Sequence, residues 1–250
     1  MRLKTKLALA MSALLAGVAA TAQTKAPEPD YTLSFNVGAT SDYRFRGIAQ
    51  TSFNPALQAG VDFAHKSGFY LGAWGSNVSW IKDYAGATDG SMEIDLYGGY
   101  KGEIGKDLGY DLGLITYQYP GNTAATNANT TEIYAALSYG PVTAKYSRSV
   151  GNFIANPDSS GSAYLEVAAN FDMGHGLTLT PHVGRQMVPN VAGNAGDYTD
   201  YSLTLVKDFG NGLSVSLAAL GTNADKVFYT DTQGKFLGKD ALVVGLKYGF

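Results

Sequence analysis

The chain has 250 residues, 45% of them hydrophobic and only 16% charged, with 31 glycines, 17 tyrosines and no cysteine. The lack of cysteine excludes disulfide frameworks, zinc knuckles and thiol nucleophiles, and the low charge with many apolar residues argues against disorder. A formal net charge of −3, without a basic cluster beyond the N-terminus, argues against nucleic-acid binding.

The first 22 residues have the pattern of a secretory signal peptide. Three basic residues lie within the first six positions, an apolar run follows from 7 to 20, and Ala20-Thr21-Ala22 provides a cleavage site of small residues. The run of about 14 residues is shorter than the roughly 20 that a membrane-spanning helix needs. We therefore expect a signal peptide at 1–22, a lead-in at 23–30 and one folded domain at 31–250.

From residue 31 onward, apolar residues recur at every second position, which is the period of a half-buried β-strand. Leu33, Phe35 and Val37, for example, alternate with polar residues, and we expect this first strand to continue to about residue 46. No helical spacing of apolar residues and no long apolar run follows the first 22 residues. The pattern predicts twelve strands, near 33–39, 57–63, 69–80, 92–97, 108–119, 133–139, 142–150, 163–171, 177–183, 201–205, 213–219 and 241–250.

The connections between these strands alternate in length. Those after every even strand are short, at 65–68, 102–107, 140–141, 172–176 and 208–212. Those after every odd strand are longer and polar, at about 47–54, 81–91, 120–130, 151–161, 187–199 and 222–239. An even number of strands near ten residues, with short turns on one side and long loops on the other, is typical of a transmembrane β-barrel. The alternative is a soluble β-sandwich, whose strands also alternate.

The outward face distinguishes the two folds. It carries almost no charge in its central rows, and aromatic residues gather at the strand ends, as they do at membrane interfaces. Tyr43, Phe45, Tyr146 and Tyr201 are expected to point outward near the long loops. We therefore predict an all-β, antiparallel up-and-down transmembrane barrel of about 12 strands, with short periplasmic turns and long extracellular loops.

The C-terminal strand has the pattern of an assembly signal. Its outward residues are in phase with the terminal aromatic residue: Leu242, Val244, Leu246, Tyr248 and Phe250. This arrangement resembles the recognition signal that the β-barrel assembly machinery reads. With the signal peptide, it predicts the outer membrane of a Gram-negative bacterium as the location. The expected partners are this machinery, outer-membrane lipid and lipopolysaccharide.

Residues 39–51 (ATSDYRFRGIAQT) resemble the opening motif of the TorF family of predicted porins. The similarity continues through 55–60, 67–72, 74–78 and 93–100. The resemblance implies an outer-membrane barrel that passes small hydrophilic solutes or ions by diffusion. It implies no catalytic residues and no cofactor.

The residues opposite the apolar face would line the interior of the barrel. The acids among them are Asp42, Asp62, Glu93, Asp95, Asp111, Glu132, Glu166 and Asp200, and the bases are Arg44, Arg46, Lys101, Lys145 and Lys247. An excess of acids predicts a weak preference for cations. These groups could equally pair with one another and brace the wall. Arg44 and Arg46, expected on one face of the first strand, could guide anions or neutralise Asp42 and its neighbours.

Two other functions stay open. The barrel could be plugged and serve as a structural or surface-binding protein, or it could be a hydrolase. His182 is the one histidine expected to point inward, but no serine or aspartate shares a catalytic spacing with it on its strand. The three histidines are too widely spaced to indicate a metal site.

Overall fold

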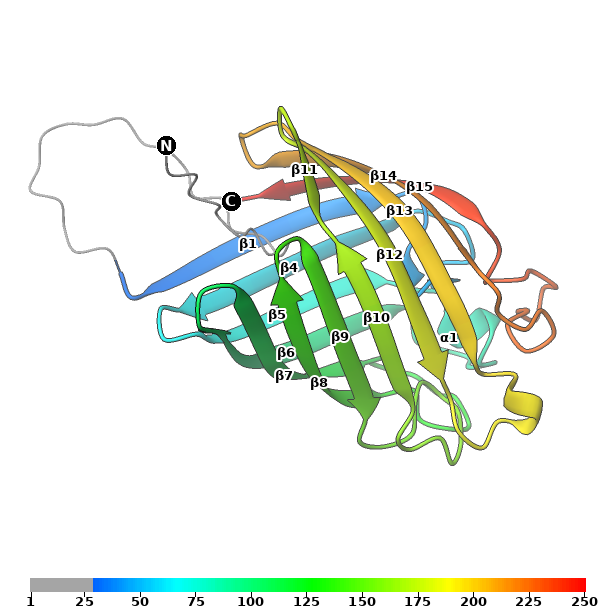
Figure 1. Ribbon diagram of the computed structural model, residues 1–250. Coiled ribbons are helices and arrows are strands. Elements are labelled where there is room, and N and C mark those ends of the chain that lie inside the picture. The colour runs from blue at the N-terminus through cyan, green and yellow to red at the C-terminus, as the bar shows by residue number, and fades with distance from the viewer. Residues whose placement is uncertain (1–28) are drawn as a thin grey trace, which may run out of the picture.

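The strands form where the sequence alternates, and they close into an antiparallel barrel (Figure 1). The computed structural model describes residues 29–250, so the predicted signal peptide and most of the lead-in lie outside the described residues. The strands of the barrel are β1 Tyr31–Thr40, β4 Ala56–His65, β5 Phe69–Asn77, β6 Met92–Ile104, β7 Leu108–Gln118, β8 Thr130–Tyr139, β9 Val142–Ser149, β10 Ala163–Ala169, β11 Phe171–Gly174, β12 Leu177–Met187, β13 Tyr198–Asp208, β14 Leu213–Thr222 and β15 Ala241–Gly249.

These elements make twelve spanning strands, because β10 and β11 are two parts of one strand that is interrupted at Asn170. Both parts pair with β12, and β10 also pairs with β9. The barrel closes where β1 pairs with β15, with Asn36 opposite Gly249. The predicted fold class and strand number are therefore confirmed.

The connections follow the predicted alternation. Short turns join the strands at one end, at 66–68, 105–107, 140–141, 175–176 and 209–212. Long loops join them at the other end, at 41–55, 78–91, 119–129, 150–162, 188–197 and 223–240. These loops hold the remaining elements: the short strands β2 (Arg44–Phe45) and β3 (Ile48–Ala49), helix α1 (Trp80–Asp83) and the 3-10 helix η1 (Ala192–Asn194). In Figure 1 the long loops lie at the right.

Within residues 29–250, no helix is long and apolar enough to cross a membrane.

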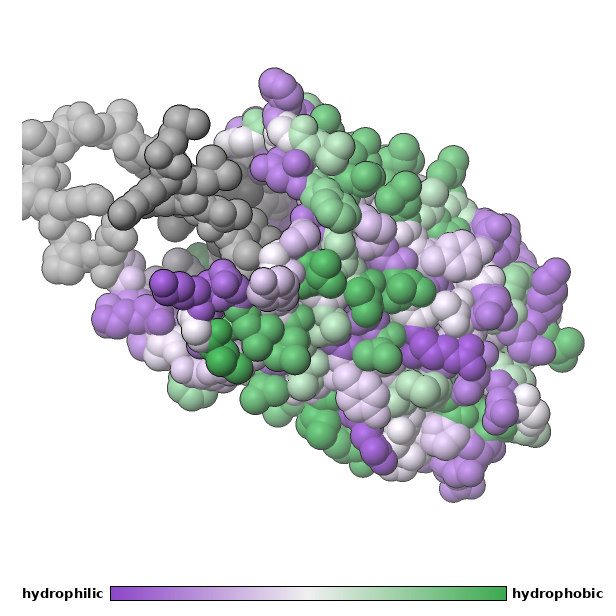
Figure 2. Space-filling view, viewed as in Figure 1, coloured by the Kyte–Doolittle hydropathy of each residue, from purple (hydrophilic) through white to green (hydrophobic). Residues whose placement is uncertain are grey.

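The outer face of the barrel is apolar and exposed. Leu57 and Leu242, for example, are 74% and 72% exposed. Hydrophobic side chains cover much of the wall in Figure 2, and hydrophilic ones gather toward the loop end. Aromatic pairs stand at the short-turn end, where the rings of Phe35 and Phe250 stack at 5.8 Å across the closing seam. Such a surface is suited to contact with lipid rather than water.

The first strand ends earlier than predicted. β1 stops at Thr40, and the positive φ angles of Arg46 (48°) and Gly47 (80°) turn the chain back on itself. The expectation that Tyr43 and Phe45 join the outer aromatic girdle is therefore wrong. The Tyr43 ring packs edge-on against Trp74, and the Phe45 ring packs against Tyr117, both inside the barrel. The physical reason is the glycine turn, which the alternation of apolar residues does not register.

Candidate functional site

The first long loop, residues 41–55, folds into the loop end of the barrel, and we call it the hairpin loop. Its centre is the pair β2–β3, in which Arg44 lies opposite Ala49 and Phe45 opposite Ile48. The tip at Gly47 presses on the inner wall, since a Cβ there would lie 2.5 Å from Cγ2 of Thr222. We call the half of the barrel interior that the loop occupies the upper lumen, and the half nearer the short turns the lower lumen.

Apolar packing holds the hairpin loop on both sides. Tyr43 and Phe45 pack against a cluster that includes Trp80 and Tyr117. Ile48 and Ala49 belong to a second buried cluster, formed with Tyr198, Ala224 and Leu237. The apolar core of the protein thus lies around this loop, at one end of the barrel.

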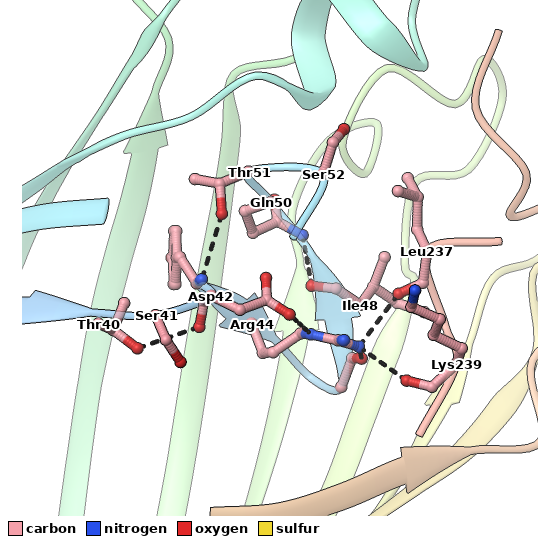
Figure 3. A network of polar contacts seen from close by, with 12 residues as sticks. Thr40, Ser41, Asp42, Arg44, Ile48, Gln50, Thr51, Ser52, Leu237 and Lys239 are labelled. Carbon is pink, nitrogen blue, oxygen red and sulfur yellow. Dashed lines mark hydrogen bonds and ion pairs between the residues drawn. The ribbon is translucent and has the colours of Figure 1, made fainter. Parts of the chain in front are cut away.

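Arg44 fixes the hairpin loop to the last long loop (Figure 3). Its Nε atom lies 2.6 Å from Oδ2 of Asp42, and its Nη1 atom donates hydrogen bonds to the carbonyl oxygens of Gly47, Leu237 and Lys239. Burial raises the pKa of Asp42, and the Arg44 guanidinium offsets only part of this rise. Arg44 therefore works as an anchor between loops, with its charge matched locally.

Arg46 crosses the upper lumen from the hairpin loop to the far wall. Its Nη2 atom lies 2.6 Å from Oε2 of Glu132 on β8, and its Nη1 atom donates to Oε1 of Gln186 on β12 at 2.8 Å. The guanidinium also lies 4.2 Å from the ring centroid of Tyr164 on β10. Burial alone would lower the pKa of Arg46, but the Glu132 carboxylate more than compensates and the pKa is raised. One side chain thus ties the loop to three strands.

A pair of acids on β6 lies behind the hairpin loop. Glu93 is fully buried and accepts a hydrogen bond of 2.7 Å from the Tyr43 hydroxyl, and Asp95 is 7% exposed. Within residues 29–250, no Lys, Arg or His side chain forms an ion pair with either carboxylate. Glu93 therefore braces the loop through Tyr43, and both acids lie in a buried setting.

The wall of the lower lumen is built from tyrosine rings that lie against glycines of the neighbouring strand. A Cβ at any of these inward-facing glycines would lie closer than 3.0 Å to the ring of a tyrosine on the neighbouring strand. The pairs are Tyr97 on Gly72, Tyr70 on Gly99, Tyr134 on Gly113 and, at the border with the upper lumen, Tyr164 on Gly184. Because the glycines leave room at the wall, these large side chains do not project across the interior.

The same tyrosines organise the charges of the lower lumen. The hydroxyl of Tyr97 donates to Asp62 at 2.5 Å, and that of Tyr70 donates to Asp111 at 2.6 Å. The Lys145 ammonium lies 4.4 Å from the ring centroid of Tyr134. Carboxylates thus meet the hydroxyl ends and a lysine lies over a ring face, so both signs of charge line this wall.

His182 sits between two carboxylates just beneath the hairpin loop. Its Nε2 atom lies 3.1 Å from Oε2 of Glu166, and its Nδ1 atom lies 3.5 Å from Oδ1 of Asp200. The Tyr164 hydroxyl donates to Asp200 at 2.8 Å. With a carboxylate at each ring nitrogen, the imidazole has no free nitrogen with which to activate a nucleophile. In the described part of the chain, no three metal-ligating side chains are arranged to hold an ion.

The structure brings the predicted interior residues together in two groups. The upper group lies on the hairpin loop and on the wall around it, and comprises Asp42, Arg44, Arg46, Glu93, Asp95, Glu132 and Asp200. The lower group lines the wall beneath it and comprises Asp62, Lys145, Glu166 and His182. The expectation that Arg44 and Arg46 share one face of the first strand is wrong, because both lie beyond its end. Gln186 and the four wall tyrosines were missed, although the glycines at inward positions could have indicated the tyrosines.

Comparisons with known proteins identify a family and a fold. The model of a family described as "Bacterial protein of unknown function (Gcw_chp)" matches residues 23–250. No curated protein sequence matches the chain. Among solved structures, a KdgM porin is 8% identical with a TM-score of 0.57, over 87% of this chain and 99% of that one. A KdgM porin in complex with disordered oligogalacturonate is 7% identical with a TM-score of 0.55, over 87% of this chain and 98% of that one. A NanC porin is 11% identical with a TM-score of 0.51, over 87% of this chain and 98% of that one. The chain therefore has the fold of these porins.

Proposed function

This chain belongs to the Gcw_chp family of bacterial proteins of unknown function, and we propose that it is an outer-membrane channel for small hydrophilic solutes. The solutes would cross by passive diffusion through the barrel interior. The porin fold supports a membrane-spanning barrel. The exposed apolar outer face supports it independently, because water would not stabilise that surface.

The observation that carries the proposal is the wall of the lower lumen. The tyrosine rings lie against wall glycines, so these large side chains do not fill the centre of the lower lumen. The opposite wall carries small hydroxyl residues such as Ser202, Thr204 and Ser216, all partly exposed. A twelve-stranded barrel lies between eight strands, which side chains fill, and sixteen strands, which leave a wide channel. The composition of this wall supports a narrow aqueous path.

The hairpin loop would set the size limit of the channel. It is held by Arg44, Arg46 and two apolar clusters, so it forms a fixed constriction in the upper lumen. The same anchoring is what a permanently plugged barrel would need. Conductance decides between a constriction and a plug.

The patterns at residues 1–22 and 242–250 support the proposed location and partners. The signal peptide at 1–22 would direct export, and the outward residues from Leu242 to Phe250 would be read by the β-barrel assembly machinery. Deleting Phe250 should lower the folded yield in outer-membrane fractions, because its ring and backbone close the seam with Phe35. The resemblance to the TorF family stays a prediction, since the matching family model carries another name.

The proposal is tested by single-channel recordings in planar bilayers, with swelling of proteoliposomes in neutral sugars of rising size. We expect discrete conductance, entry of the smallest sugars and exclusion of the larger ones. Thr204→Trp places a large side chain in the lumen and should lower the conductance, whereas Leu203→Trp, the matched control, faces outward and should not. A folded barrel without conductance would replace the channel with the plugged barrel.

A further inference from the structure

The outward positions of the described strands carry charge of one sign only, and Asp240, an acid close to them, lies just before β15 beside Tyr201. At the strand positions that share a face with the exposed apolar residues, the only Asp, Glu, Lys or Arg side chains within residues 29–250 are Arg148, Arg185 and Lys207. Lys207 lies at the short-turn end, and both arginines lie at the long-loop end. A surface that faces a bilayer has no need of cations, because charge near hydrocarbon is costly. The absence of acids among these outward positions indicates a negatively charged neighbour.

The two arginines lie on one panel of the wall, made by β9, β10 and β12. Arg148 on β9 is opposite Ala163 on β10, and Arg185 on β12 is opposite Leu165 on β10. They are therefore two strands apart, which is about 10 Å, and offset by two residues along the strands. Only Ala163 and Leu165 stand between them on this face. Two long cationic side chains thus flank a small apolar floor.

Both guanidinium groups reach away from the apolar band toward the long loops. The Nη2 atom of Arg148 is beside Gly161, where an added Cβ would lie 3.1 Å from it. Arg185 donates from Nη1 to Oγ1 of Thr199 at 3.4 Å, and its Nη2 atom lies 3.6 Å from Oδ2 of Asp197. The Arg185 side chain is 47% exposed and its ion pair with Asp197 is long. The pair therefore orients Arg185 but neutralises little of its charge. The arrangement is typical of cations that extend to the level of lipid headgroups.

We propose that this panel binds a phosphate group of lipopolysaccharide in the outer leaflet. The inference rests on the proposed outer-membrane location, in which the long loops are extracellular. Guanidinium groups recognise phosphate through charge-assisted hydrogen bonds, often in pairs. Below them, the exposed side chains of Leu165, Val167 and Val183 offer an apolar surface to the acyl chains. One amphiphile with an anionic head and several tails satisfies both parts of the panel.

A second copy of the chain fits this panel poorly. In a twofold dimer the same surface meets itself, so the two arginines would face the arginines of the other copy. The outward positions of the described strands hold no acid to compensate them; the acids at this end, Asp197 and Asp240, lie just beyond the strands, and Asp197 is already beside Arg185. Charge complementarity therefore favours the lipid.

The test is native mass spectrometry of the detergent-solubilised full chain, titrated with bisphosphorylated lipid A, with the same lipid lacking both phosphates, and with phosphatidylglycerol. Wild type should retain the bisphosphorylated lipid best. The double variant Arg148→Gln/Arg185→Gln should bind it about 30-fold more weakly, from the usual contribution of two basic residues at an anionic surface. Lys207→Gln, the matched control at the other end of the wall, should bind like wild type.

Each other outcome overturns a defined part of the proposal. Equal binding of the lipid without phosphates, or of the double variant, removes the phosphate site. Equal retention of phosphatidylglycerol, lost in the same variant, replaces lipopolysaccharide with anionic lipid in general. Conductance in bilayers free of lipopolysaccharide should be the same for wild type and the double variant. A wild type that binds lipid A but does not conduct would overturn the channel and leave this site standing.

Discussion

The two halves of the lumen hold their arginine and lysine side chains in different ways. In the upper lumen, Arg44 and Arg46 are buried and each meets a carboxylate at 2.6 Å. In the lower lumen, Lys145 lies over a tyrosine ring, and Asp62 accepts a tyrosine hydroxyl. Direct ion pairs suit guanidinium groups in a dry region that must keep one geometry, because a buried guanidinium without a carboxylate is costly. Charges held by tyrosines suit a wet wall, where they stay exposed to passing solutes. The comparison can be tested one contact at a time.

The largest effect is expected where the upper lumen loses its bridging charge. Arg46→Ala leaves Glu132 buried without its partner, which should destabilise the folded protein by about 3–5 kcal/mol. Thermal unfolding in detergent micelles measures this loss. Conductance should rise in the same variant, because the hairpin loop loses its bond to β8 and β12. A change below about 1 kcal/mol would show that this pair contributes no more than a surface ion pair.

The next largest effect is the difference in folding between a charge placed on the outer face of the wall and one placed on its inner face. Leu203→Arg puts a charge on the outer face at mid-strand and should cost about 2–4 kcal/mol, whereas Ser202→Arg points into the wet lumen and should cost much less. Folding yield into liposomes, followed by heat-modifiable mobility on gels, distinguishes the two. Equal yields would mean that the face assigned to the lipid is wrong.

A smaller effect is expected at the tyrosine wall of the lower lumen. Gly113→Ala should destabilise the barrel by roughly 1–3 kcal/mol, because the new methyl group overlaps the Tyr134 ring and the Gly98 carbonyl. Gly109→Ala, on the same face of β7, meets nothing closer than 3.6 Å and serves as the control. The melting temperatures in micelles should differ accordingly. If Gly113→Ala unfolds like Gly109→Ala, the close ring contact does not hold in solution.

The smallest effect on stability concerns the lysine on the ring. Lys145→Ala should change stability by less than about 1 kcal/mol, since a partly exposed cation–π contact contributes no more than that. In a salt gradient, its reversal potential should nonetheless shift toward cation selectivity, because a positive charge has left the aqueous path. Ala144→Ser, at the adjacent outward position, should leave the reversal potential unchanged. A large loss of stability without a shift would place Lys145 among the bracing residues.

The barrel was predictable from the sequence because its determinants are local. The alternation in 57–63 or 213–219, and the turn at Gly140 and Pro141, each act within about ten residues. The hairpin loop was not predictable, because its position depends on partners far along the chain. Arg46 is 140 positions from Gln186, and nothing near Arg46 indicates that residue. Counting inward charges could not distinguish buried acids from acids that face the lumen, because burial also depends on distant partners. Glu93 and Asp62 both face inward, but only Glu93 is dry.

The anchors of the hairpin loop also fix an order of events in assembly. The loop follows the first strand, yet its Arg44 binds the carbonyl oxygen of Lys239, 195 positions later. Contacts between such distant segments form late, after the intervening chain has been ordered. The wall itself closes by pairing β1 with β15, across a similar separation, so the closed wall and the anchored constriction are completed at the same late stage. A chain that stalls before the last loop would lack both β15, which closes the wall, and the carbonyl groups that anchor Arg44, so the final segment completes the barrel and its constriction together.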